Sequence, residues 1–93
     1  MSIFDSLRLY AGKWSVREQR SFTPEEINLI SLAVVVPSNF GCSVEFSKKG
    51  GGKMYIPLSN DATVSVGEVI DLNKAILVTL YKNGENDIYR VMI

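Results

Sequence analysis

Alternation of apolar and polar residues is clearest on both sides of a run of three glycines. Before the glycines, Cys42, Val44 and Phe46 alternate with Ser43, Glu45 and Ser47, and after them the apolar positions are Met54, Ile56 and Leu58. A period of two is typical of a strand that buries one face. The stretch from Gly41 to Leu58 therefore predicts a β-hairpin, and the rest of the fold is organised around it.

The loop length of this hairpin sets its register. A two-residue turn at Gly50-Gly51 would pair Phe46 with Tyr55 and place apolar side chains opposite polar ones. An odd-length loop pairs Phe46 with Met54 and puts all six apolar side chains on one face. Three-residue loops need a glycine in the left-handed region, which this loop supplies. We therefore expect the odd loop, with Tyr55 and the flanking lysines facing solvent and with Pro57 at a strand end or sheet edge.

Three further strands are predicted. Residues 27–36 end in three valines and are followed by Pro37, which favours a strand. Residues 75–82 and 87–93 flank Asn83-Gly84, a strong hairpin signal. An even-length loop there places Tyr89 and Val91 on the face of Ile76 and Val78. Both faces of this hairpin carry apolar residues, which indicates a closed barrel or a subunit contact.

Helical signals are confined to the first third of the chain. Ser2 and Asp5 resemble a capping box, apolar residues follow at helical spacing, and Gly12 is a natural stop, so a short amphipathic helix is expected near the N-terminus. Residues 14–22 read as an irregular or extended link. Thr23 and Glu26 form a second capping box around Pro24, which competes with the strand signal after it, and we expect at most one helical turn there.

Composition narrows the class of protein. The 93 residues make one domain, with an N-terminal segment at 1–22 and a β-barrel at 23–93. The net charge of zero argues against a protein that coats polyanions by bulk electrostatics. A single cysteine excludes an internal disulfide, and with no histidine a zinc site is not expected. The sequence lacks a cleavable leader or a membrane-spanning run, so a cytoplasmic location is expected. No metal or cofactor is expected.

Catalytic chemistry is not predicted. Glu25 and Glu26 suit the first turn of a helix, and Asp61, Glu68 and Asp71 fall in turns. Cys42 lies on the inward face of its strand and is expected to be a core thiol. The run Gly50-Gly51-Gly52-Lys53 lacks the glycine spacing and the hydroxyl residue of a P-loop. The protein is therefore expected not to be an enzyme.

The order and spacing of the five strands, with an irregular connection at 59–74, resemble the OB-fold, and SH3-like barrels share much of this pattern. The run Val66-Gly67-Glu68-Val69-Ile70-Asp71-Leu72 looks like the apolar-Gly-acidic entry common in such barrels. Phe40 to Phe46 followed by Tyr55-Ile56-Pro57-Leu58 is similar to small phage and mobile-element single-stranded-DNA-binding proteins. The resemblance covers residues 27–93. It implies a mainly β, five-stranded antiparallel barrel that holds single-stranded DNA by aromatic stacking and basic clamps.

The first functional hypothesis is therefore a non-enzymatic single-stranded nucleic-acid-binding accessory protein. Its candidate contacts lie on the first hairpin and, if the two hairpin faces adjoin, on the second as well: Lys48, Lys49, Lys53, Tyr55, Tyr81 and Arg90. Aromatic side chains stack on bases of any sequence, and lysines contact phosphates. The same residues are also what a plain sheet surface with a lysine-blunted edge would carry.

The second hypothesis is a protein-interaction or assembly module that does not bind nucleic acid. Its candidate interface is made of apolar and aromatic residues outside the predicted barrel: Phe4, Leu7, Tyr10, Trp14 and Phe22. Exposed aromatics commonly anchor interfaces, and the N-terminal helix could dock on a second subunit as a homo-oligomer. Alternatively, the helix plugs its own barrel.

Overall fold

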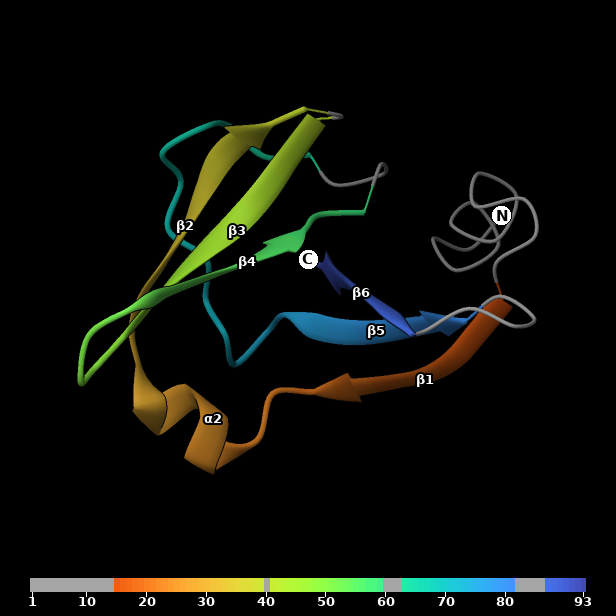
Figure 1. Ribbon diagram of the computed structural model, residues 1–93, viewed down its shortest axis with the longest axis horizontal. Coiled ribbons are helices and arrows are strands. Elements are labelled where there is room, and N and C mark those ends of the chain that lie inside the picture. Colours follow the sequence, from red (N-terminus) through yellow and green to blue (C-terminus); the bar gives the residue numbers. More distant parts are fainter. Residues whose placement is uncertain (1–14, 40, 60–62, 82–86) are drawn as a thin grey trace.

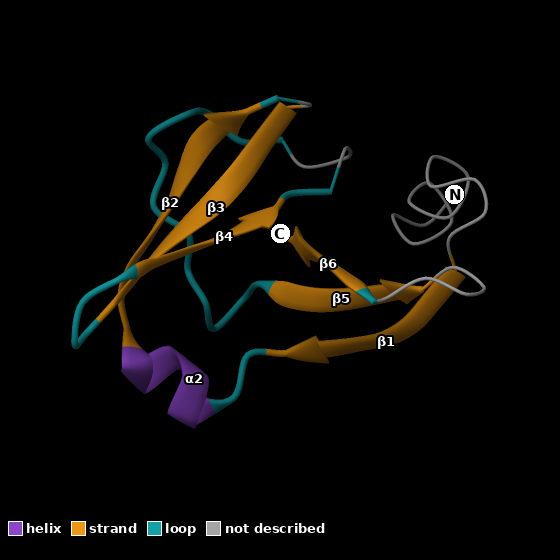
Figure 2. Ribbon diagram, viewed as in Figure 1, coloured by secondary structure: helices purple, strands orange, loops and turns teal. Residues whose placement is uncertain are grey.

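The computed structural model describes residues 15–39, 41–59, 63–81 and 87–93 as a mainly β protein with one short helix (Figure 1). Its elements are β1 (Ser15–Ser21), α2 (Pro24–Leu29), β2 (Ile30–Ser38), β3 (Gly41–Lys48), β4 (Lys53–Pro57), β5 (Ile76–Tyr81) and β6 (Ile88–Met92). They form two antiparallel three-stranded sheets, with strand orders β1-β5-β6 and β2-β3-β4. Figure 2 shows the two sheets with α2 crossing between β1 and β2. The expected N-terminal helix, with Phe4, Leu7, Tyr10 and Trp14, lies outside the described residues.

The predicted register of the first hairpin is confirmed. Val44 pairs with Ile56 and Phe46 with Met54, and the Leu58 N–H donates to the Cys42 carbonyl at 3.0 Å. Val44 and Phe46 are fully buried, whereas Met54 is 40% exposed, so the expectation that all six side chains converge inward is wrong at that position. Met54 sits next to the loop, where the hairpin borders a cavity instead of the core.

The core lies between the two sheets. Ala33, Val35, Val44 and Phe46 from one sheet pack with Leu77 and Val91 from the other. Loop residues Ile70, Leu72 and Ala75 complete this cluster, and Cys42 packs at its edge half-buried, as expected of a core thiol. Phe22 is buried against Phe46, with ring centroids 5.8 Å apart. The expectation that Phe22 belongs to an exposed interface is therefore wrong, because the turn after β1 directs its ring into the core.

Residues 15–21 form a sixth strand where an irregular or extended link was expected. β1 pairs with β5 from Ser15↔Tyr81 to Ser21↔Ile76, with a bulge between Val16 and Glu18. The segment has little apolar alternation of its own. Its extended conformation is stabilised by backbone hydrogen bonds to the edge of β5, a tertiary interaction that the local sequence does not encode.

The capping box at Thr23 forms as predicted, but the helix is longer than one turn. Thr23 caps α2, Pro24 is its first residue, and the chain becomes extended at Ile30, where β2 begins. The strand therefore starts three residues later than expected. The capped helix continues to Leu29, and the β-branched residues that follow favour a strand from there on.

The second hairpin has a different register from the one expected. Leu77 pairs with Val91, Thr79 with Tyr89, and Leu80 with Ile88. Val91 therefore shares the core-facing side with Leu77, and the expectation that Tyr89 and Val91 lie on the face of Ile76 and Val78 is wrong. The turn expected at Asn83-Gly84 lies outside the described residues. The opposite face of this sheet is also apolar, since Val78, Leu80 and Met92 form a second cluster with Val16, Ile76 and Ile88.

The two sheets touch but do not close into a continuous barrel. Leu58 and Val91 form an isolated parallel bridge, and the Ser59 N–H donates to the Val91 carbonyl at 2.9 Å. From that point β4 and β6 diverge. On the other side, the segment around Glu68 runs along β2, with the Val35 N–H donating to the Glu68 carbonyl at 2.9 Å. The expected closed five-stranded barrel is therefore corrected to two contacting sheets with six strands in the described chain.

Candidate nucleic-acid interface

A groove of about 360 Å³ opens where the edge strands β4 and β6 diverge. Both strands are sheet edges, and the bridge between Leu58 and Val91 holds them together at one end only. The groove is lined from β4 by Met54, Tyr55, Ile56 and Pro57, and from β6 by Ile88, Tyr89 and Arg90. Pro57 thus lies on an edge strand, as predicted, since it has no N–H for a ladder bond.

Two tyrosines flank this groove from opposite sheets. Tyr55 is 56% exposed and Tyr89 is 48% exposed. Arg90 lines the same groove, and its Nη1 donates to the Tyr89 carbonyl at 3.1 Å. Exposed aromatic rings beside a cation form the type of surface on which unpaired bases stack. The groove therefore joins two of the predicted contacts, Tyr55 and Arg90, from different hairpins.

Glu45 holds Tyr55 and Lys53 in place. The Tyr55 hydroxyl donates to Glu45 Oε2 at 3.0 Å, and Lys53 Nζ lies 3.1 Å from Glu45 Oε1. The Lys53 ammonium and then the Tyr55 hydroxyl lower the pKa of Glu45, and the hydrogen bond to Glu45 raises the pKa of both Lys53 and Tyr55. The Glu45 carboxylate therefore offsets part of the positive charge of Lys53, and its hydrogen bond to the Tyr55 hydroxyl fixes the orientation of the Tyr55 ring.

Tyr81 does not join this groove. Arg17 lies over its ring at 4.4 Å from the centroid, and Arg17 Nε also pairs with Asp87 Oδ1 at 3.1 Å. The register places Tyr81 and Arg90 on opposite faces of their sheet, because Arg90 faces Val78. Tyr81 is not among the residues that line the groove with Arg90, so the structure does not bring these two predicted contacts together. The Arg17 guanidinium occupies the ring face that a base would need.

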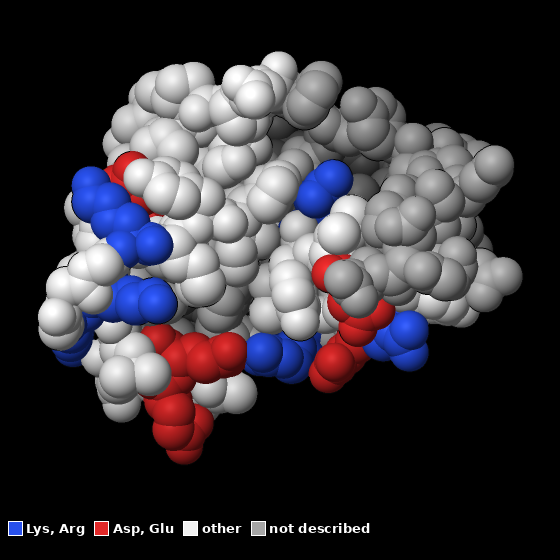
Figure 3. All heavy atoms as spheres, in the orientation of Figure 1, with Lys and Arg blue, Asp and Glu red and all other residues white. Residues whose placement is uncertain are grey.

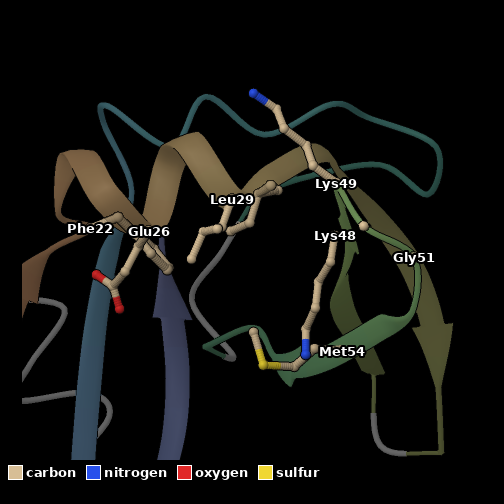
Figure 4. Close-up of a pocket in the computed structure, with 9 residues that line it drawn as sticks. Phe22, Glu26, Leu29, Lys48, Lys49, Gly51 and Met54 are labelled. Carbon is tan, nitrogen blue, oxygen red and sulfur yellow. The ribbon is translucent and has the colours of Figure 1, made fainter.

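A second hollow, of about 430 Å³, lies between α2 and the glycine loop. The Lys49 N–H donates to the Leu29 carbonyl at 2.9 Å, which fixes the loop against the end of the helix. In Figure 4, Lys48 reaches toward Met54 and Lys49 points away. The wall consists of Phe22, Glu26, Leu29, Ile30, Lys48, Lys49, Gly50, Gly51 and Met54. Because Met54 lines both hollows, this cavity adjoins the tyrosine groove.

Charge is unevenly distributed around these hollows. Figure 3 shows basic side chains over the β3–β4 hairpin and acidic ones over α2. Among the described residues, the ion pairs are Arg17–Asp87, Arg20–Glu26 and Lys53–Glu45, and none involves Lys48 or Lys49. These two lysines are thus the cations of the hairpin that are most available to an anionic ligand.

Sequence reasoning missed Tyr89, because the wrong register assigned it to the other face of its hairpin. It also missed the cavity beside α2, since a helix of one turn would have left no wall there. In the described part of the chain, no group of three or more cysteines and carboxylates is arranged to hold a metal ion, and no helix is long and apolar enough to cross a membrane. No family model matches the chain, and neither the curated proteins nor the solved structures contain a match to it.

Proposed function

We propose that this protein binds single-stranded nucleic acid along the groove between β4 and β6. Bases stack on Tyr55 and Tyr89, while Arg90 and the hairpin lysines contact phosphates. The observation that carries this proposal is that two exposed tyrosines from different sheets flank one groove that also holds an arginine. This arrangement needs no particular base sequence and no cofactor.

The magnitudes are sufficient for useful affinity. Stacking of a base on an aromatic side chain contributes about 1–3 kcal/mol. Two stacked bases with several phosphate contacts can therefore reach micromolar dissociation constants, which correspond to about 8 kcal/mol. With a net charge of zero, the attraction comes from the local cations and not from the protein as a whole.

The topology supports an OB-like interpretation of the groove. In OB-folds the face of strands 2 and 3 is a nucleic-acid-binding surface. β3 and β4 occupy those places in the five-stranded pattern of residues 27–93, and β4 carries Tyr55. β1 pairs with β5, β2 pairs with β3, and α2 lies between β1 and β2 in the chain. We interpret the fold as an OB-like barrel that opens between β4 and β6.

Fluorescence anisotropy with labelled oligo-dT tests the proposal. Binding is expected at low salt and is expected to weaken as salt rises, because phosphate contacts release counterions. The double variant Lys48→Ala/Lys49→Ala should bind more weakly and show a shallower salt dependence. Lys74→Ala, which removes an exposed lysine in the turn after Asp71, is the matched control. Absence of binding at low salt rejects the function, and equal loss in Lys74→Ala rejects the lysine site.

A second candidate function is capture of an extended peptide. In an antiparallel ladder, alternate residues direct their main-chain N–H and C=O groups away from the partner strand. The hydrogen bonds of Lys48 and Leu58 set this alternation in β4, and they assign the outward direction to Lys53 and Tyr55. Within the described residues, β4 pairs only with β3. An open strand edge can accept an extended peptide as an added strand. A peptide that competes with oligo-dT for the groove supports this candidate, whereas oligo-dT binding alone favours the first.

To test whether the protein self-associates through its N-terminal segment, a deletion of residues 1–22 is unsuitable. That deletion removes β1 and exposes the edge of β5. A variant that starts at Ser15 keeps all six described strands. Light scattering on the full chain and on this shorter chain then compares their masses. A dimeric full chain with a monomeric shorter chain supports assembly through the N-terminal segment, and two monomers argue against it.

A further inference from the structure

The cavity between α2 and the glycine loop has the composition of a ligand site in its own right. Its wall combines large apolar side chains with two lysines from one strand end. We propose that this cavity binds a small amphipathic anion, with an apolar body inside and one carboxylate or phosphate at Lys48. This inference goes beyond nucleic-acid binding, because it assigns a separate ligand class to a neighbouring site.

The apolar part of the wall is exposed without a ligand. Leu29 is 66% exposed and Met54 is 40% exposed, although both border the same hollow. Phe22 and Ile30 form the deeper wall, and Phe22 continues into the core through Phe46. A ligand that covers Leu29 and Met54 removes apolar surface from water, which is the driving force for binding in such pockets.

The charge at the rim selects an anion. Lys48 and Lys49 form no ion pair with the described carboxylates. Glu26 also borders the cavity, but Arg20 binds its carboxylate at 2.7 and 3.0 Å, and the Thr23 N–H donates to it at 2.8 Å. Figure 4 shows the Glu26 carboxylate pointing away from Leu29 and Met54. The negative charge of Glu26 is thereby neutralised and directed away from the hollow, and the Lys48 ammonium, which reaches toward Met54, is the charge that faces it.

The geometry of the cavity is held by main-chain bonds. The Lys49 N–H donates to the Leu29 carbonyl at 2.9 Å, so the loop and the helix end keep a fixed separation. The loop is itself closed by the Lys48 N–H donating to the Gly52 carbonyl at 3.0 Å. A volume of about 430 Å³ is within the range of small-molecule sites. The cavity is thus largely formed before a ligand enters.

Isothermal titration calorimetry with eight-carbon probes tests this proposal on the full chain. Octanoate and octyl phosphate carry an anion, octanol is neutral, and octyltrimethylammonium is cationic. Both anions should bind, and the tighter of the two identifies the headgroup class. Octanol should bind up to about fivefold more weakly, since it lacks the charge that contacts one exposed lysine, Lys48. Equal binding of all four probes, or no binding of the two anions, overturns the proposal.

Matched variants locate the site. Lys48→Ala should weaken octanoate binding up to about fivefold, whereas Lys49→Ala, whose side chain points away from the cavity, and Lys74→Ala should not change it. Leu29→Gln should weaken it at the apolar wall, and Val66→Gln, at a similarly exposed apolar position outside the cavity, is its control. Tyr55→Ala/Tyr89→Ala should leave octanoate binding intact even where it abolishes oligo-dT binding. Octanoate binding lost in the controls, or retained in both cavity variants, contradicts the assignment.

Discussion

The Arg20 guanidinium binds the Glu26 carboxylate through two hydrogen bonds, Nη1 to Oε1 at 2.7 Å and Nη2 to Oε2 at 3.0 Å. This pair joins the end of β1 to the first turn of α2. The same carboxylate accepts the Thr23 N–H at 2.8 Å, which completes the capping box. The pair therefore fixes the start of α2, which forms one wall of the cavity between this helix and the glycine loop.

Loss of this carboxylate should destabilise the fold. Glu26→Gln weakens the bond to Arg20 and the reciprocal cap, and we expect a free energy of unfolding lower by about 1 kcal/mol. The expected loss is modest because the side chain is 37% exposed and the pair is partly screened by solvent. Urea denaturation measures it. Glu25→Gln, in the same helical turn and exposed, is the control, and an equal loss there would contradict the role of the Arg20 pair.

The same carboxylate predicts a pH dependence. The Arg20 hydrogen bond and then the Thr23 backbone N–H lower the pKa of Glu26 from 4.5 to about 2. A depressed folded-state pKa contributes stability above the unfolded value, and this contribution is lost as pH falls through the folded value. The difference in stability between the wild type and Glu26→Gln should therefore shrink between pH 4.5 and about 2. Urea midpoints of both proteins across that window test this, and a constant difference would argue against it.

Paired residues of the first hairpin should respond very differently to truncation. Phe46 is fully buried and contacts Phe22, whereas its partner Met54 is 40% exposed. Phe46→Ala should cost about 3–5 kcal/mol because it leaves a cavity in the core. Met54→Ala should cost less than about 1.5 kcal/mol, since it removes surface side-chain atoms. Thermal or urea denaturation compares them, and similar losses would contradict the assigned faces.

Glu45 should weaken nucleic-acid binding in the wild type. Its carboxylate contacts both Lys53 and Tyr55 and carries the opposite charge to Lys53 beside the proposed groove. Glu45→Gln should release the Lys53 charge and tighten oligo-dT binding, by up to about fivefold for one exposed ion pair. Anisotropy at low salt measures the change. Weaker binding in this variant would mean that orientation of Tyr55 by Glu45 matters more than the charge.

Local sequence was sufficient for two parts of the fold. The register of β3 with β4 followed from matching apolar faces across a glycine loop, because a one-residue shift would expose Phe46. The capping box at Thr23 and Glu26 also formed as its spacing predicted. Both features depend on residues close together in the chain.

Long-range features were not readable in the same way. β1 is a strand because its backbone pairs with the edge of β5. Phe22 is buried because its ring packs against Phe46 of the opposite sheet. Tyr89 joins Tyr55 only through the meeting of Leu58 and Val91, which are far apart in sequence. Lys48, Lys49, Tyr55 and Arg90 were identified from residue type and hairpin position, whereas the groove and the cavity needed the packing of separate elements.

Stacking on both walls of one groove is tested most directly by removing the two rings. Anisotropy with oligo-dT at low salt should show a loss of at least about tenfold in affinity for Tyr55→Ala/Tyr89→Ala, because each stacked base contributes about 1–3 kcal/mol. Tyr81→Ala, whose ring is already covered by Arg17, should bind nearly as tightly as the wild type. Undiminished binding by a folded double variant, or an equal loss in Tyr81→Ala, would contradict the proposed groove.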